Sequence, residues 1–234
     1  SGTNTIGGII GIHIPHPELS LPIGLSFYTF RNLSYLFDIY LSKVSAQRNF
    51  LTFSVYSTMF PYTSAGPIVR YTDIETQLKQ RTINISKFGI GAELFVKGLA
   101  KKVLLADNLS VLYSSICGHP QMSVFTSWLG ILAYTMQLYF DFSGYSDMAI
   151  GLGKMLGFDF NKNFDYPYIS TSVSEFWRRW HISLGSWFRD YIYIPLGGNR
   201  VSTLKHIRNI LVVWALTGLY ARRYAVSHNL SRPY

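Results

Sequence analysis

Residues 122–142 decide the fold, and they read MSVFTSWLGILAYTMQLYFDF. The stretch carries no charge before Asp141, and no Asp, Glu, Lys or Arg occurs between Asn108 and Phe140. A helix needs roughly 20 mostly apolar residues to cross the hydrocarbon core of a bilayer. We therefore predict a transmembrane helix near Met122–Phe142 that continues into residues 141–157.

The composition of the whole chain favours a membrane protein. Of 234 residues, 48% are hydrophobic and only 14% are charged, whereas soluble domains carry about 25% charged residues. The formal net charge of +9 lies between hydrophobic runs, as in membrane proteins with basic cytoplasmic loops. This distribution argues against nucleic-acid binding, and the hydrophobic content excludes a disordered chain. The single Cys117 excludes an internal disulfide framework and a cysteine-cluster metal site.

The rest of the chain predicts an all-α, polytopic integral-membrane bundle with short re-entrant or interfacial helices. In the first part, Arg31 and Asp38 must be paired or lie near a membrane edge, because isolated charges at membrane depth are costly. Farther on, Pro61 and Pro67 end or kink a helix. The three further candidate spans are Leu21–Tyr40, Asn49–Val69 and Ile207–Leu219.

The segment Arg70–Lys102 is predicted to lie at the cytoplasmic face. Its Lys and Arg residues outnumber its Asp and Glu residues, and cytoplasmic loops of membrane proteins carry this bias. Two interpretations stay open. The segment is either a solvated loop that touches lipid headgroups or a site for an anionic acyl donor.

A first group of candidate site residues lies at 137–147, in the sequence QLYFDFSGYSD. Ser143 and Asp147 share one helical face, and Asp141 and Tyr145 share another, because residues four apart are neighbours on a helix. Carboxylates at membrane depth usually face a polar cavity or a partner, so these residues are candidates for a polar site. The alternative is that both acids brace neighbouring helices. Gly144 would allow close helix packing.

A second group lies at 175–190, in the sequence EFWRRWHISLGSWFRD. On one continuous helix, His181 would lie on an aromatic, water-poor face with arginines close by. Desolvation and positive neighbours both lower a histidine pKa and leave the ring neutral, as a general base for a hydroxyl requires. The alternatives are a structural histidine and an interfacial belt of tryptophans and arginines. The candidate site residues here are Glu175, Trp177, Arg178, Arg179, Trp180, His181, Arg189 and Asp190.

A third group lies at 191–200, in the sequence YIYIPLGGNR. Pro195 and the two glycines predict a turn. Its backbone amides could hold an anion beside Asn199 and Arg200, and the alternative is a plain connecting turn.

These groups and three further motifs together resemble the membrane-bound O-acyltransferase (MBOAT) family. The resemblance is to its bacterial branch, which acts in alginate O-acetylation and teichoic-acid D-alanyl transfer, and it covers Leu21 to Leu219. The matching motifs lie at residues 22–30, 60–70, 98–107, 139–153, 175–184 and 189–200.

The resemblance implies a multi-pass helical enzyme of the bacterial inner membrane, surrounded by lipid, with a polar funnel across the bilayer. Such enzymes move an acyl group, here acetyl or D-alanyl, from a cytoplasmic thioester to a hydroxyl on the far side. The donor, acyl-CoA or an acyl-carrier protein, is a cosubstrate, and no bound cofactor or metal is expected. The acceptor is an exported polysaccharide, a teichoic acid or a protein that relays the acyl group.

The resemblance also assigns roles to residues. His181 matches the histidine of the family's Trp-Arg-Arg-Trp-His motif and is expected to support or share the catalytic role. The acids and Ser143 of the first group would shape the funnel. Arg178, Arg179 and Arg200 would orient anionic groups.

The chain departs from the family after Thr217-Gly218-Leu219. The family places its principal catalytic histidine there, in a Trp-His-Gly motif, whereas this chain reads Tyr220-Ala-Arg-Arg-Tyr224. We expect residues 1–219 to be part of the membrane domain of a longer enzyme. Residues 220–234 would be a divergent polar tail that arose by frameshift or truncation, which the other two reading frames of the gene would reveal.

Two other classes of function stay open. A catalytically inactive membrane scaffold of the same family would dock a partner without transferring an acyl group. A channel or transporter would use Asp141 and Asp147 on an ion path.

Overall fold

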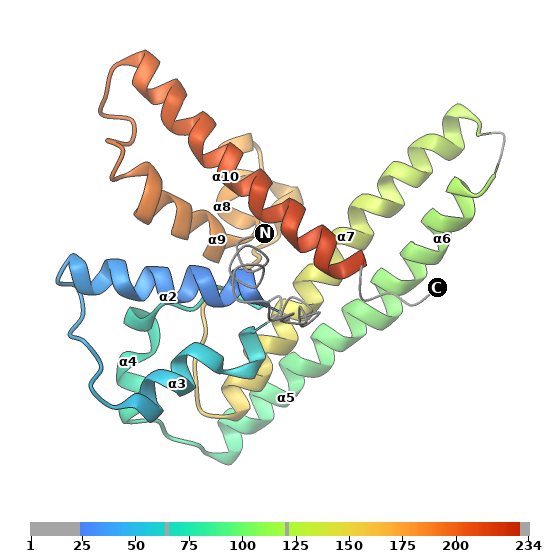
Figure 1. Cartoon of the computed structure of the whole chain (residues 1–234). Helices are drawn as coiled ribbons and strands as arrows, with labels where there is room; N and C mark the ends of the chain where they lie inside the picture. Colours follow the sequence, from blue (N-terminus) through green and yellow to red (C-terminus); the bar gives the residue numbers. More distant parts are fainter. Residues whose placement is uncertain (1–23, 64–65, 120–121, 230–234) are drawn as a thin grey trace, which may run out of the picture.

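The computed structural model describes residues 24–63, 66–119 and 122–229, and within them the chain is helical with no strand. This confirms the all-α prediction. Figure 1 shows α2, α3 and α4 gathered in one group, while α6 and the first half of α7 extend away from it as a two-helix arm. The elements are α2 (Leu25–Tyr40), α3 (Phe50–Thr58), η1 (Phe60–Tyr62), α4 (Tyr71–Lys79), α5 (Ile85–Ala100), η2 (Lys101–Ala106), α6 (Asp107–Cys117), α7 (Val124–Met155), η3 (Pro167–Ile169), α8 (Val173–Arg179), α9 (Ile182–Phe188), η4 (Arg189–Tyr193) and α10 (Thr203–Asn229).

Helices α5 and α7 approach each other closely at two pairs of glycines. A Cβ atom on Gly98 would lie 2.5 Å from the carbonyl oxygen of Gly144, and one on Gly91 would lie 2.7 Å from that of Gly151. The contacts are reciprocal, because Cβ atoms on the α7 glycines would meet the carbonyl oxygens of the same α5 partners. Small residues let two helix backbones touch in this way. The close packing predicted at Gly144 is therefore confirmed.

Gly98→Ala is expected to lower the free energy of unfolding by about 1–3 kcal/mol, because the added methyl group overpacks a backbone contact. Gly89→Ala is the matched control in the same helix, since a Cβ there meets nothing within 4 Å. The control should gain about 0.5–1 kcal/mol from the better helix former. Denaturant unfolding of both variants in detergent, followed by circular dichroism, measures the difference. Equal stability of the two variants would contradict the glycine contact.

Within the part of the chain that the structure describes, no helix combines the length and the apolar character of a membrane span. The helix predicted at Met122–Phe142 is present, since α7 begins at Val124 after its N-cap Ser123. The membrane span predicted there is not found among the described helices. The helix predicted within Asn49–Val69 ends before its prolines, as expected, at Thr58.

Both charged side chains of α2, Arg31 and Asp38, have polar partners, as predicted. The buried guanidinium of Arg31 donates hydrogen bonds to the carbonyl oxygens of Ser57 (2.6 Å) and Tyr62 (2.8 Å). The equally buried carboxylate of Asp38 accepts a hydrogen bond of 2.8 Å from the hydroxyl of Tyr191. These bonds attach the middle of α2 to α3 and η1 and its C-terminal part to η4.

Candidate active site

The prediction of a single helix across residues 175–190 is wrong, because the chain leaves the helical conformation at Trp180 and His181. Helix α8 ends at Arg179 and α9 begins at Ile182. Between them Trp180 is extended, and His181 has a φ of +45° in the left-handed region. A non-glycine residue in this region is uncommon, although histidine is enriched there, and such strained residues gather at functional sites.

The loop at residues 161–165 holds this interruption in place through the backbone. The amide of Ile182 donates to the carbonyl oxygen of Asn163 at 2.9 Å. The amide of Asp165 donates to the carbonyl oxygen of Arg179, also at 2.9 Å. The two bonds fix the chain on both sides of the left-handed residue.

The ring of His181 lies in an aromatic cage and is only 7% exposed. It meets Phe142 edge to face, with 4.7 Å between ring centroids, and lies nearly parallel to Phe164 at 6.4 Å. Burial lowers the pKa of His181 to about 3, so the ring is neutral near pH 7. The predicted neutral state is supported, but burial is its cause and the neighbouring arginines are not. Among the described residues, Nε2 of His181 is buried with no hydrogen-bond partner.

The other ring nitrogen of His181 belongs to a buried polar network centred on Asn163. Nδ1 of His181 lies 3.1 Å from Oδ1 of Asn163. The same oxygen accepts hydrogen bonds from the backbone amide (3.2 Å) and the hydroxyl (2.9 Å) of Ser183. On its other side, the Asn163 amide group donates to the hydroxyl of Ser146 at 3.0 Å. The network thus joins α7, the 161–165 loop and α9 around the histidine.

The lowered pKa of His181 predicts a pH-dependent stability. Between pH 6.5 and about 3 the unfolded chain binds a proton at this ring that the folded chain does not. The free energy of unfolding should therefore fall as the pH falls through this window, by about 1 kcal/mol per pH unit. His181→Asn should remove this part of the slope, and asparagine tolerates the left-handed backbone. Unfolding of both proteins at several pH values tests the prediction, which equal slopes would overturn.

The two acids of α7 each form an ion pair with a lysine of η2. Asp147 lies 2.5 Å from Nζ of Lys101, and Asp141 lies 2.7 Å from Nζ of Lys102. These ion pairs support the interpretation in which the acids brace neighbouring helices, and their role in a polar funnel stays a prediction.

The other two α7 candidates are Ser143 and Tyr145. Ser143, next to Phe142, is buried, and its hydroxyl has no hydrogen-bond partner among the described residues. Tyr145 packs against the apolar cluster that contains Leu184 and Trp187 of α9.

Two charged residues of α8, Glu175 and Arg179, form hydrogen bonds with each other and with the residues before the helix. Glu175 accepts hydrogen bonds from the amide and hydroxyl of Thr171 and from Arg179, and these bonds lower its pKa to about 2. Arg179 also donates to the carbonyl oxygen of Asp165 at 3.1 Å. The predicted Glu175–Arg179 pair is confirmed. Arg178 is exposed, and the role of the two arginines in orienting anionic groups stays a prediction.

The tryptophans of α8 pack on different neighbours. Trp180 meets Phe164 edge to face at 5.1 Å and stacks on Phe176 at 5.6 Å. Trp177 meets Trp214 of α10 at 5.0 Å. Trp180 therefore extends the aromatic cage behind the histidine, while Trp177 joins α8 to α10.

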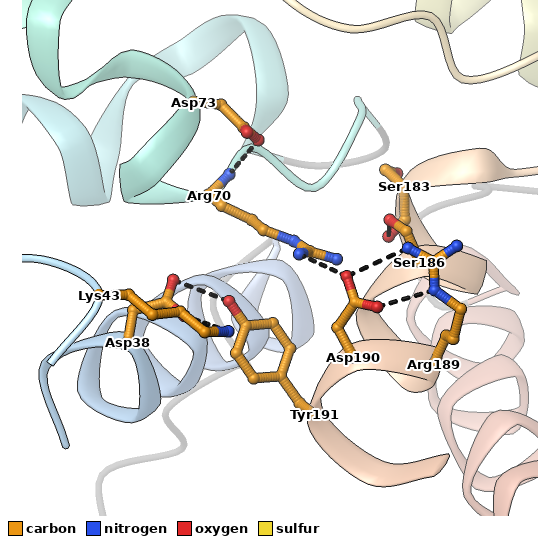
Figure 2. Close-up of polar contacts among 9 residues, drawn as sticks. All are labelled: Asp38, Lys43, Arg70, Asp73, Ser183, Ser186, Arg189, Asp190 and Tyr191. Carbon is orange, nitrogen blue, oxygen red and sulfur yellow. Dashed lines mark hydrogen bonds and ion pairs between the residues drawn. The ribbon is translucent and has the colours of Figure 1, made fainter. Parts of the chain in front are cut away.

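A pocket of about 280 Å³ lies beside the network, and Ser183 contributes to its wall. Figure 2 shows its polar side: Arg70 reaches across to Asp190, which Arg189 contacts from the same segment. The Arg70–Asp190 and Arg189–Asp190 pairs measure 2.8 Å and 2.7 Å. The lining residues are Pro67, Ile68, Val69, Arg70, Asp73, Phe160, Asn161, Lys162, Ile182, Ser183, Ser186, Arg189 and Asp190.

The electrostatics of this pocket leave positive charge available. Burial raises the pKa of Asp190, but hydrogen bonds from Arg189 and Arg70 outweigh it, so the pKa lies below its ordinary value. Asp190 is thus a carboxylate shared by two arginines. Nη2 of Arg70 is buried without a hydrogen-bond partner in the described part of the chain, and Lys162 lines the same pocket. The predicted site residues Arg189 and Asp190 therefore belong to this pocket, and His181 is not among its lining residues.

The turn at residues 195–200 is a plain connection. The amides of Gly197, Gly198 and Arg200 donate to carbonyl oxygens within or just before the turn, so they are not available for an anion. Asn209 of α10, fully buried, donates to two carbonyl oxygens of the turn and braces it. Asn199 and Arg200 are exposed, and the anion-binding interpretation is corrected.

Sequence reasoning missed the two residues that hold the histidine, Asn163 and Ser183. Asn163 lies in a loop without periodicity, and its only signal is its position in the short polar run 161–163 before Phe164. Ser183 lies within a quoted motif but carries no feature that separates it from Ser186.

A model of the MBOAT, membrane-bound O-acyltransferase family matches residues 21–219. The chain belongs to this family. The match ends where the predicted resemblance ends, at Leu219, and it contains the histidine, the Asn163 network and the pocket. The MBOAT assignment thus rests on the segment that builds the candidate site.

Several bacterial enzymes are similar to this MBOAT chain. The probable alginate O-acetylase AlgI of Pseudomonas aeruginosa is 50% identical over 203 residues, which cover 87% of this chain and 39% of that protein. The peptidoglycan O-acetyltransferase of Helicobacter pylori is 34% identical over 238 residues, covering 89% and 45%. The teichoic acid D-alanyltransferase of Bacillus subtilis is 30% identical over 194 residues, covering 78% and 47%. The chain spans less than half the length of these relatives.

Proposed function

We propose that this chain is part of a bacterial inner-membrane O-acyltransferase. The enzyme would move acetyl or D-alanyl from a cytoplasmic thioester, acyl-CoA or an acyl-carrier protein, to a hydroxyl of an exported polysaccharide, teichoic acid or relay protein. The observation that carries the proposal is the neutral, buried His181, whose Nε2 has no hydrogen-bond partner among the described residues. The names of the relatives, which include O-acetyl- and D-alanyltransferases, support the reaction class.

In this reaction a histidine takes the proton of the acceptor hydroxyl as the oxygen attacks the thioester carbonyl carbon, and His181 would support or share that role through Nε2. The new C–O bond forms, the C–S bond breaks, and the proton passes to the leaving thiolate. One ester and one thiol result. The pocket at Arg70 and Lys162 would hold an anionic part of a substrate, the role expected of Arg178, Arg179 and Arg200.

The channel alternative would need an ion path along Asp141 and Asp147, each of which is paired with a lysine. A chimera separates the enzyme from the inactive scaffold. Residues 21–219 would replace the corresponding segment of the Pseudomonas aeruginosa relative in a strain that lacks its own copy. We expect acetylated alginate from this strain. Unacetylated alginate, with the chimera present in the membrane at the level of the resident protein, would overturn the proposal.

A further inference from the structure

We infer that Asn163 is a positioning residue that holds His181 in the tautomer with the proton on Nδ1 and the lone pair on Nε2. The inference about the tautomer stands on geometry alone. Its value for catalysis rests on the proposed function, since only an unprotonated Nε2 can take a proton from an acceptor hydroxyl.

The first step is the orientation of the Asn163 amide. The backbone N–H of Ser183 can only donate, and it points at the Asn163 side chain from 3.2 Å. The atom that receives it must therefore be the amide oxygen, because a flipped amide would place two donors face to face. The same orientation leaves Nδ2 free to donate to the Ser146 hydroxyl. The contacts at Oδ1 and at Nδ2 thus both support the same orientation of the Asn163 amide.

The second step is the hydroxyl of Ser183. It accepts a hydrogen bond of 3.0 Å from the backbone N–H of Ile68. Its own proton is then directed to Oδ1 of Asn163, 2.9 Å away. The hydroxyl and the backbone N–H of Ser183 therefore both donate to Oδ1 of Asn163. The backbone N–H can only donate. Oδ1 is an acceptor that the fold fixes.

The fixed acceptor Oδ1 determines which ring nitrogen of His181 carries the proton. A ring nitrogen that lies 3.1 Å from a fixed acceptor forms a hydrogen bond only when it carries the proton. A neutral imidazole has one N–H, so Nε2 holds the lone pair. This is the nitrogen that the structure buries without a partner among the described residues. Asn163 thereby fixes Nε2 as the acceptor nitrogen of His181.

The spectroscopic test measures the ring nitrogens directly. The chain is labelled with ¹⁵N-histidine, placed in lipid bilayers and examined by nuclear magnetic resonance, with His181 assigned by its loss in His181→Asn. We expect a protonated Nδ1 and an unprotonated Nε2 at neutral pH. A proton on Nε2 in the unmodified chain would overturn the inference.

Two variants separate positioning from support of the loop. Asn163→Leu has a similar size but no acceptor, and its His181 should lose the exclusive Nδ1 proton. Asn163→Asp keeps an acceptor oxygen in place, so Nδ1 should stay protonated even where the leucine variant fails to fold. Asn199→Asp, at an exposed asparagine outside the pocket and the network, is the matched control and should leave the ring spectrum unchanged. Loss of the Nδ1 proton in the aspartate variant, or its retention in a folded leucine variant, would contradict the role of Asn163.

The same variants in the chimera distinguish this inference from the proposed function. We expect Asn163→Leu to lower acyl transfer at least tenfold and Asn163→Asp to restore part of it. If the tautomer is as inferred but the unmodified chimera transfers no acyl group, the proposed function fails alone. If the chimera transfers acyl groups with the proton on Nε2, the inference fails alone.

Discussion

His181→Asn in the chimera is expected to lower the rate of acyl transfer by about 10²–10⁴-fold, the usual contribution of a general base. Asparagine tolerates the left-handed backbone at this position, so the loss should come from the missing Nε2. The loss should fall on kcat, because the proton is taken in the transition state. Transfer of a radiolabelled acetyl group in membranes that contain the chimera measures the rate.

The matched control for this variant is His119→Asn, since His119 is exposed and lies outside the network. Its rate should stay within about twofold of the unmodified chimera, as is usual for surface substitutions. A His181→Asn chimera as fast as this control would remove His181 from the catalytic machinery and favour a structural role.

Arg31→Met is expected to lower the free energy of unfolding by about 2–5 kcal/mol, because it leaves buried carbonyl oxygens without donors. Arg31 is 1% exposed and contacts the carbonyl oxygens of Tyr56, Ser57 and Tyr62. Methionine fills much of the aliphatic volume, so the loss reports the hydrogen bonds. Denaturant unfolding in detergent gives the value.

Arg48→Met serves as the control for this substitution, because Arg48 is exposed. It should change the free energy of unfolding by no more than about 0.5 kcal/mol. A similar small change for Arg31→Met would show that the buried guanidinium does not hold α2 against the segment that ends α3.

The helices could be predicted from the sequence because their signals are local. The apolar run and the N-cap Ser123 indicate where α7 begins, and Pro61 explains why α3 ends at Thr58. That Arg31 and Asp38 would each have polar partners followed from the cost of isolated buried charges. Each of these inferences needs only neighbouring residues and a general energetic rule.

The site could be predicted only in part, because its geometry depends on contacts between distant segments. The left-handed φ of His181 breaks the continuous helix that the spacing of Trp177, Trp180 and His181 predicts. Asn163 reaches the ring from 18 positions earlier in the chain. Nothing in the sequence distinguishes this asparagine from Asn161, which is exposed.

The acids of α7 illustrate a second limit. The sequence around Asp141 and Asp147 is compatible with two interpretations, a polar site and ion pairs that brace neighbouring helices. Which one applies depends on the side chains that contact the two acids in the folded protein. Lys101 and Lys102 face them because the glycine contacts bring α5 and η2 against α7. Helix pairing, which one sequence does not show, supports the second interpretation.

The proposed function of this segment is acyl transfer from a thioester to a hydroxyl with the participation of His181. Its most direct test is purified chimera in proteoliposomes with labelled acetyl thioester and unacetylated alginate, measuring ester formed and thiol released together. The account predicts one ester per thiol with the unmodified segment, and neither above background with His181→Asn. Thiol release without ester, or equal ester formation in both proteins, would contradict it.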